Sequence, residues 1–209
     1  MRWFYEAVRV VIVLGSKIWL NVSFEGKENI PESGGYIVAC NHRSNWDPPL
    51  LAEAFPRQVF FMAKEELFRI PVLGQILRWV GAFGVERGAG DFSALDHAVK
   101  LIEQGGLLGI FPEGTRSKDG KPLRPKSGMA MIARQAKAGV IPCAVVMDGP
   151  VHFRSKVKIK IGKPISYEEL FPEESNAAVR RATKMVMGQI IDMMELPPEE
   201  AGPAEGSQA

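Results

Sequence analysis

The chain has 209 residues, of which 46% are hydrophobic and 24% are charged. A chain of this length forms one domain with a sizeable core, and its composition excludes both a disordered protein and a polytopic membrane protein. The net charge of +2 combines a basic part, residues 1–167 with +8, and an acidic part, residues 168–209 with −6. A basic body favours a phosphate-bearing substrate, an anionic bilayer or nucleic acid, and charge alone does not choose among them.

Residues 3–20 predict a helix with aromatic side chains near both ends. Charged residues interrupt it, so a single membrane-spanning helix of about 20 apolar residues is not expected. We expect an amphipathic helix in the membrane interface; the alternative is a helix simply packed on the domain. The side chains expected at headgroup depth are Trp3, Phe4 and Trp19, and those expected to face anionic lipid are Arg2, Arg9 and Lys17.

Strand-like and helix-like patterns alternate after this helix, which predicts one α/β domain. Most strand candidates are continuous apolar runs, as in strands covered on both faces, whereas the last one alternates strictly between apolar residues and lysines. The candidates are Val22–Gly26, Tyr36–Cys40, Val59–Ala63, Ala82–Glu86, Leu107–Phe111, Val140–Met147 and Lys156–Ile161.

The predicted helices fall between these strands. Ser127 is expected to cap one helix that ends at Gly139. The apolar faces of the others are Val72, Leu73, Ile76, Leu77 and Val80; then Leu95, Ala98, Val99 and Ile102; then Val179, Val186, Ile190 and Met193. The predicted units are an interfacial helix (1–24), one globular domain (25–196) and a disordered Pro/Gly/Glu-rich tail (197–209).

The two cysteines, Cys40 and Cys143, lie in apolar runs and lack a metal-ligand spacing. We therefore expect buried free thiols in a reducing compartment. No cleavable signal is expected, because the apolar start has no small-residue cleavage site. Residues 60–83 are rich in large apolar side chains and are expected to line an acyl tunnel, touch lipid or pack as core.

The first segment with chemical potential is Asn41–Pro49, directly after an apolar strand. Open α/β sheets bind ligands at such strand ends, so His42 is a candidate general base. Asp47 precedes Pro48, the pattern of a helix N-cap followed by proline. If the turn brings the Asp47 carboxylate to one ring nitrogen of His42, the other nitrogen stays free to accept a proton. On spacing alone, a structural histidine and a simple cap remain alternatives.

The second segment is Phe111–Ser117, again directly after an apolar strand. Pro112 and Gly114 predict a tight turn with exposed amides, suited to an anion or an oxyanion. A solvated basic loop is the alternative, but the strand-end position favours a site shared with His42. The basic residues that follow are Arg116, Lys118, Lys121, Arg124 and Lys126, against one acid, Asp119.

Together these residues resemble the glycerolipid acyltransferases, the 1-acylglycerol-3-phosphate acyltransferase family. Four segments resemble that family's four signature blocks, in the family's order, within residues 36–148. The segments are His42-x-x-x-x-Asp47, Gly84-Val85-Glu86-Arg87, Phe111-Pro112-Glu113-Gly114-Thr115-Arg116 and Val140-Ile141-Pro142-Cys143, with Lys126-Ser127-Gly128 resembling the basic-x-Gly step after the third block. Two details depart from the pattern: Val85-Glu86 replaces a more aromatic or aspartate-bearing stretch, and Cys143 replaces an aliphatic residue.

The resemblance implies a mixed, largely parallel β-sheet flanked by helices, and an acyltransferase domain over residues 25–196. In the implied reaction an activated donor (acyl-CoA, acyl-carrier protein or acyl phosphate) acylates the free hydroxyl of 1-acylglycerol-3-phosphate, giving phosphatidic acid for phospholipid synthesis. No cofactor or metal is implied. His42 is the implied base, Asp47 orients it, and Pro142 has an acyl-donor or structural role. The implied substrate-binding residues are Arg87, Glu113, Gly114, Thr115, Arg116 and Lys126.

The expected partners are membrane lipids through the N-terminal helix, lysophosphatidic acid, and acyl-CoA or acyl-carrier protein, at the cytoplasmic face of the membrane. The sequence contains no serine-nucleophile elbow and no P-loop, so direct transfer is favoured over an acyl-enzyme. One alternative is another acceptor, such as a different lysophospholipid or glycerol-3-phosphate. A non-catalytic lipid-binding protein is the alternative from another class, and nucleic-acid binding is not expected, because no recognition motif is present.

Overall fold

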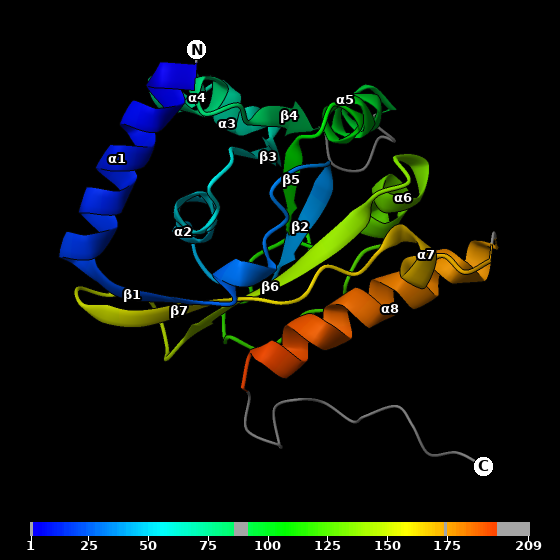
Figure 1. The fold of residues 1–209 in the computed structure, drawn as a ribbon. Coiled ribbons are helices and arrows are strands. Elements are labelled where there is room, and N and C mark those ends of the chain that lie inside the picture. The colour runs from blue at the N-terminus through cyan, green and yellow to red at the C-terminus, as the bar shows by residue number, and fades with distance from the viewer. Residues whose placement is uncertain (1, 86–91, 174, 196–209) are drawn as a thin grey trace.

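The computed structural model describes residues 2–85, 92–173 and 175–195, which fold into one sheet flanked by helices (Figure 1). The strands are β1 (Leu20–Glu25), β2 (Tyr36–Cys40), β3 (Val59–Lys64), β4 (Phe83–Val85), β5 (Leu107–Ile110), β6 (Gly139–Met147) and β7 (Ser155–Ile161). The helices are α1 (Arg2–Trp19), α2 (Asp47–Ala54), α3 (Glu65–Phe68), α4 (Leu73–Trp79), α5 (Phe92–Glu103), α6 (Gly128–Gln135), α7 (Tyr167–Leu170) and α8 (Asn176–Met193), with a 3-10 turn η1 (Lys27–Asn29).

The seven strands form a single sheet in the order β1-β7-β6-β2-β5-β3-β4. Neighbouring strands run parallel except β6 and β7, which are antiparallel. The predicted α/β domain with a mixed, largely parallel sheet is therefore confirmed. The described bounds of each predicted strand lie within two residues of an observed strand, and β2 has the predicted bounds; Glu86, the predicted end of the fourth strand, lies outside the described residues. The predicted boundary at residue 24 falls inside β1, so residues 20–24 belong to the sheet. The predicted tail (197–209) lies outside the described residues.

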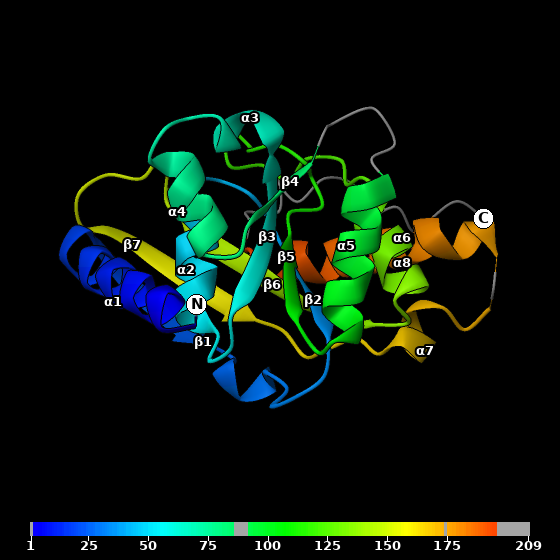
Figure 2. The same cartoon turned by 90° about the horizontal axis from the view of Figure 1, so that it is seen from above.

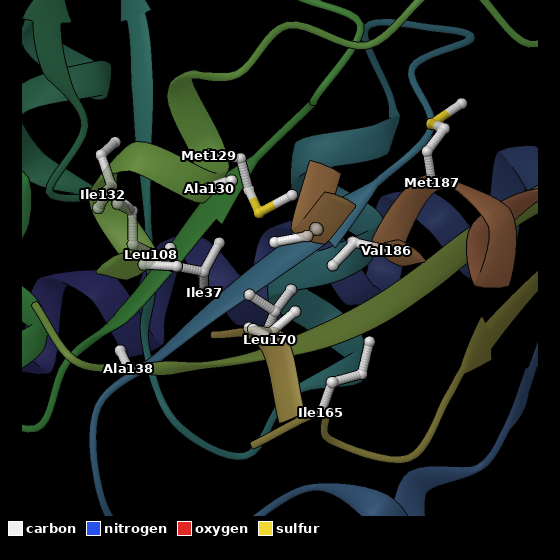
Figure 3. Close-up of a cluster of buried hydrophobic side chains, with 14 of the residues drawn as sticks. Ile37, Leu108, Met129, Ala130, Ile132, Ala138, Ile165, Leu170, Val186 and Met187 are labelled. Atoms are coloured by element: carbon white, nitrogen blue, oxygen red, sulfur yellow. The ribbon is translucent and has the colours of Figure 1, made fainter. Parts of the chain in front are cut away.

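Two hydrophobic cores lie on opposite faces of the sheet, because successive side chains of a strand point to opposite sides. In β2, Ile37 and Ala39 face the core covered by α5, α6, α7 and α8, which Figure 3 shows. Val38 and Cys40 face the core on the α2 side. Figure 2 shows α1 and α4 at one side of the sheet and α5, α6 and α8 at the other. Both cysteines are free and buried in the α2-side core, as predicted.

The N-terminal helix α1 is attached to α2 through buried polar contacts. Tyr5 is buried, and the Ser16 hydroxyl donates to Glu53 Oε2 at 2.6 Å. Arg9 Nη2 donates to the carbonyl of Phe55 at 3.2 Å, and its Nη1 lies 3.5 Å from Glu6. The prediction that Arg9 faces lipid is therefore wrong, because its guanidinium turns inward to the Phe55 carbonyl at the end of α2.

Two further helix predictions need correction. Ser127 precedes α6, but its hydroxyl makes no cap hydrogen bond and contacts Met131 Sδ instead. The helix ends at Gln135 and not at the predicted Gly139, which is the first residue of β6. The predicted face around α4 is half exposed: Val72 is 74% and Ile76 is 38% accessible. Across the described ranges, no helix is both long enough and apolar enough to cross a bilayer.

Replacing Ser16 by alanine should lower the free energy of unfolding by about 1–3 kcal/mol, because the buried Glu53 carboxylate loses its hydroxyl donor. Urea unfolding followed by tryptophan fluorescence measures the change. Ser23→Ala, on the exposed side of β1, is the matched control and should cost only a few tenths of a kcal/mol. Equal costs for the two variants would show that the Ser16–Glu53 contact does not stabilise the fold.

Candidate active site

The catalytic candidates meet at the carboxyl edge of the sheet. Strands β2 and β5 are parallel neighbours with Ala39 opposite Ile110, so they end side by side. The loops that follow these strands carry His42 and Glu113. The Ser117 amide donates to the His42 carbonyl at 2.8 Å, which joins the two loops directly. The prediction that both segments share one edge of the sheet is confirmed.

His42 and Asp47 are in direct contact. His42 Nδ1 lies 2.8 Å from Asp47 Oδ2, the His42 side chain is 18% exposed and the Asp47 side chain is fully buried. On its face the imidazole stacks on Phe111, with ring centroids 4.0 Å apart and planes 17° apart. One ring nitrogen is thus occupied by the carboxylate, and the ring plane is fixed by an aromatic neighbour. Nε2 is left as the nitrogen that can exchange a proton.

Asp47 holds the histidine loop and does not cap α2. Its Oδ2 also accepts from the backbone N–H groups of Arg43 and Ser44, both at 2.7 Å. The helix begins at Asp47 itself, with Trp46 as its N-cap and no side-chain cap bond. The predicted N-cap role is therefore wrong: the carboxylate turns back to the loop that precedes the helix. Asp47 Oδ1 is buried with no hydrogen-bond partner among the described residues.

Glu113 lies beneath the surface and connects two loops. It is 3% exposed, and its two carboxylate oxygens accept from the backbone amides of His42 and Leu123, each at 3.4 Å. Burial raises the pKa of the Glu113 carboxyl to about 7, and the two amide hydrogen bonds oppose this shift without cancelling it. In this position Glu113 contacts the backbone of the site and presents little surface to a substrate.

The turn after β5 has the tight geometry that the sequence predicts. Gly114 has φ +69° and donates its N–H to the Phe111 carbonyl at 2.9 Å. The Lys126 amide donates to the Pro112 carbonyl at 2.8 Å, and a Cβ at Gly114 would lie 3.0 Å from Lys126 Cδ. The exposed Lys126 side chain therefore lies directly over Gly114, and the positive φ of this residue favours glycine at the turn.

The remaining predicted site residues are spread around this centre. Thr115 and Arg116 are exposed, and Arg116 Nη1 donates to Asn45 Oδ1 at 2.9 Å. Pro142 is buried inside β6 opposite Ala39, and its carbonyl accepts from Gly162 at 2.8 Å, which agrees with the structural alternative for this residue. Arg87 lies outside the described residues.

Two residues that flank His42 were missed by the sequence interpretation. The buried Asn41 side chain donates to the Val145 carbonyl at 3.0 Å and accepts from the Val145 amide at 2.7 Å. Arg43 Nη1 donates to the Met147 carbonyl, and a Cβ at Gly120 would lie 2.4 Å from Arg43 Nη2. The hydrogen-bond partners Val145 and Met147 are each 104 residues away along the chain, so no local spacing could have identified them.

A cleft of about 590 Å³ opens beside the histidine loop. It is bounded by residues 43–44, by residues 115–120 and by Met147 and residues 149–151 after β6. Three basic side chains line it (Arg43, Arg116 and Lys118), against a single acid, Asp119. The cleft is therefore basic and adjoins the candidate catalytic pair.

Comparison with known proteins agrees with this geometry. The family model described as Acyltransferase matches residues 21–146. The 1-acyl-sn-glycerol-3-phosphate acyltransferase of Bacillus subtilis strain 168 is 33% identical over 201 residues, which cover 91% of this chain and 96% of that protein. The chain belongs to the 1-acyl-sn-glycerol-3-phosphate acyltransferase family. A Streptococcus pneumoniae strain R6 enzyme of the same name is 32% identical over 180 residues, covering 81% of this chain and 65% of that protein.

A solved structure supports the same family assignment. The crystal structure of the 1-acyl-sn-glycerophosphate (LPA) acyltransferase PlsC from Thermotoga maritima matches with a TM-score of 0.70 and 27% identity, covering 92% of this chain and 81% of that one. The resemblance seen in the sequence is thus confirmed, and the His42–Asp47 and Phe111–Arg116 segments both lie within the matched residues 21–146 of this acyltransferase.

The raised pKa of Glu113 predicts a specific dependence of stability on pH. Between about pH 4.5 and pH 7 the folded protein keeps a proton that the unfolded chain has released, so this group's contribution to the free energy of unfolding falls as pH rises. Urea unfolding of wild type and Glu113→Gln between about pH 5 and pH 8 measures it, and the variant should lack this decline. Glu103→Gln, on the exposed surface of α5, is the control. Parallel pH profiles for wild type and Glu113→Gln would contradict the shift.

Proposed function

We propose that His42 is the general base of an acyl transfer that converts lysophosphatidic acid to phosphatidic acid. The observation that carries this proposal is the 2.8 Å contact between His42 Nδ1 and the buried Asp47 Oδ2 at the carboxyl edge of the sheet. Family membership supplies the reaction, since the relatives bear the name of 1-acyl-sn-glycerol-3-phosphate acyltransferases. A protein that only binds lipid has no need of a buried carboxylate aligned with a stacked imidazole.

The proton balance of the reaction follows from this geometry. His42 Nε2 takes the proton of the free glycerol hydroxyl, and the oxygen attacks the carbonyl carbon of a thioester donor. The carbon–sulfur bond then breaks, and the imidazolium returns its proton to the leaving thiolate. Asp47 stabilises the imidazolium in between and keeps Nε2 directed at the hydroxyl. With an acyl phosphate donor, the bond that breaks is carbon–oxygen and phosphate leaves.

The phosphate of the acceptor is assigned to the Gly114 turn. The Lys126 stem is packed over Gly114, which places an ammonium beside the loop that joins His42 through Ser117. Arg87 is proposed as the main cation for the same phosphate, with Arg116 and Lys126 in support, because the resemblance implies a phosphate-binding arginine in the block that contains Arg87. Glu113 is proposed to act indirectly, by holding the amides of His42 and Leu123. This arrangement favours a phosphate monoester over a larger headgroup.

We also propose that the exposed apolar surface of α1 and α4 rests in the bilayer that contains the acceptor. Helix α4 lies beside the N-terminal end of α1 in Figures 1 and 2, where Phe4 of α1 packs on Trp79 of α4 with ring centroids 4.4 Å apart. The most exposed large apolar side chains on this surface are Trp3, Val10, Val11, Leu14, Ile18 and Val72. Acceptor and product both carry acyl chains, so a catalyst in the interface avoids extracting them. The cytoplasmic face is proposed because thioester donors are made there.

Replacing His42 by alanine should lower turnover by at least about 10²-fold while the protein still folds, because a positioned base contributes about 10²- to 10⁴-fold. The assay follows phosphatidic acid formed from lysophosphatidic acid with acyl-CoA or acyl-carrier protein. His97→Ala, on the exposed surface of α5, should keep near-wild-type turnover. Near-full activity of His42→Ala would contradict the proposal that His42 is the base. Equal activity of the wild type on lysophosphatidic acid and on its dephosphorylated analogue would contradict the proposed phosphate site.

The bilayer contact is best tested with point variants, because deleting α1 would also remove Tyr5, Ser16 and their contacts in the folded domain. A Val11→Glu/Ile18→Glu double variant should reduce co-sedimentation with phosphatidylglycerol vesicles about tenfold or more. Met131→Glu, an exposed apolar position on α6, should leave sedimentation unchanged. Equal sedimentation of all three proteins would reject the α1 surface as the membrane contact.

A further inference from the structure

We propose that the loop between β6 and β7 docks on an anionic bilayer, together with the C-terminal end of α1. The docking surface consists of Lys17 and Trp19 of α1 and of Phe153 and Arg154 of the loop, and all four residues are exposed. This inference rests on the proposed bilayer contact of α1 and α4, and it adds a second contact that recognises lipid phosphate beside the active site. Residues 152–154 have no part in the proposed reaction.

The docking surface is built around two aromatic rings. Phe153 is 57% and Trp19 is 45% accessible, and the two rings pack edge to face with centroids 5.3 Å apart. Trp19 follows Ile18, which is 68% accessible, so the pair continues the exposed apolar surface of α1 to the end of that helix. Burial of such side chains at a lipid interface is favourable, and aromatic residues are common there. An apolar partner is therefore expected at this end of α1.

The loop is fixed against α1 by hydrogen bonds. The Arg154 N–H donates to the Trp19 carbonyl at 2.6 Å, and Arg154 Nη1 donates to the Lys17 carbonyl at 3.5 Å. The last carbonyls of a helix lack partners within the helix, so Arg154 satisfies two of them and adds a cation at the negative end of the helix dipole. The His152 amide donates to Ser155 Oγ at 2.9 Å, and the Ser155 amide donates to the His152 carbonyl at 3.1 Å. The aromatic side chain in this turn is therefore held in position before a partner binds, which lowers the cost of ordering it.

The backbone conformation of Arg154 does not account for an arginine at this position. Its φ of +64° lies in the left-handed region that favours glycine. The bond to the Trp19 carbonyl needs only a backbone N–H, which glycine also supplies. Among the described residues, the exposed Arg154 side chain makes one hydrogen bond, at the upper limit of hydrogen-bond length. Most of the five N–H donors of the guanidinium therefore remain available to phosphate oxygens.

The charge around the two rings is positive. Residues 148–156 contain Arg154 and Lys156 against one acid, Asp148, and Lys17 of α1 adds a third cation. All three cations are exposed, and within the part of the chain that the structure describes none of them forms an ion pair. Anionic lipid attracts such residues when they lie within about one Debye length of the membrane surface.

The docking surface lies next to the active site. Strand β6 runs parallel to β2, so the loop that follows β6 is at the edge of the sheet that carries His42. Figure 2 shows this loop reaching the C-terminal end of α1, where Arg154 bonds to Trp19. Residues 149–151 of the same loop line the basic cleft. Docking of the loop therefore holds the cleft close to the headgroup layer, where the phosphate of a bilayer-bound acceptor lies.

An acidic protein would also be attracted to these cations. The bilayer is favoured because the Trp19–Phe153 pair is continuous with the exposed apolar residues of α1, so one partner with an apolar interior and an anionic surface matches both.

The charge is tested with Arg154→Gly, which keeps the left-handed φ and the backbone N–H and removes only the guanidinium. Co-sedimentation is measured with vesicles of phosphatidylcholine alone and of an equal mixture of phosphatidylcholine and phosphatidylglycerol. Arg154→Gly should weaken binding to the mixed vesicles about fivefold and leave binding to the neutral vesicles unchanged. Lys137→Gly is the matched control, because Lys137 is also an exposed cation with a positive φ (+47°), but it precedes β6 at the opposite end of that strand. It should match wild type on both.

The aromatic contact is tested with Phe153→Ser, which should weaken binding to both kinds of vesicle about tenfold, because it removes apolar surface and no charge. Met131→Ser, at an exposed apolar position on α6, should bind like wild type. Turnover of Arg154→Gly and Phe153→Ser should stay at the wild-type level on a short-chain lysophosphatidic acid dissolved as monomers, and should fall with vesicle binding when the acceptor is in vesicles.

The outcomes separate the docking surface from the proposed reaction. Wild-type protein that binds vesicles through Phe153 and Arg154 but forms no phosphatidic acid would refute the reaction and leave the docking surface standing. Unchanged sedimentation of both variants would overturn the docking surface. Unchanged sedimentation with a loss of turnover only when acyl-carrier protein is the donor would overturn it as well, and would assign these residues to an acidic protein partner.

Discussion

The buried Oδ2 atom of Asp47 accepts three donors, His42 Nδ1 and the amides of Arg43 and Ser44, and the other parts of the site are arranged around that atom. A buried carboxylate is unfavourable unless donors compensate for its lost hydration. Here two of the donors belong to the backbone, so the charge fixes the path of the loop as well as the tilt of the ring. In the proposed reaction His42 takes a proton, and the carboxylate that would stabilise the imidazolium is already in place. One atom thus combines a folding constraint with a chemical role.

The loop held by Asp47 is also tied to strands on both sides of β2. Asn41 pairs with the backbone of Val145 in β6, and Ser117, after β5, donates to His42. Glu113 adds a buried contact from the β5 side. Each of these contacts is a hydrogen bond to a backbone group of the loop or of a strand beside it. The position of His42 therefore depends on the sheet as well as on its own loop. A productive catalytic geometry has to be held to within about 0.5 Å, and contacts of this kind are what such a site needs.

The sequence was informative where local pattern decides structure. Apolar runs and the alternation of β7 located all seven strands, because burial on one or two faces dictates which residue types occur. The pattern failed where a distant partner decides. Asp47 resembled a helix cap because Asp-Pro usually is one, yet its donors lie in the preceding loop. Arg9 resembled a lipid-facing cation, but the Phe55 carbonyl attracts it inward. Asn41 and Arg43 act through residues of β6, which only the folded sheet brings near.

The reversal of direction between β6 and β7 has a consequence for how this family can diversify. Parallel neighbours require a crossover that packs on the sheet, whereas an antiparallel pair is joined by a loop that stays at one edge. Residues 148–154 form such a connection, at the edge that carries His42 and with residues 149–151 in the wall of the cleft. Lengthening it costs little, about 0.6 kcal/mol for each doubling of a flexible loop. Insertions at the tip of this loop would reshape one wall of the cleft while the Asp47 contacts, which lie in the loop after β2, stay intact.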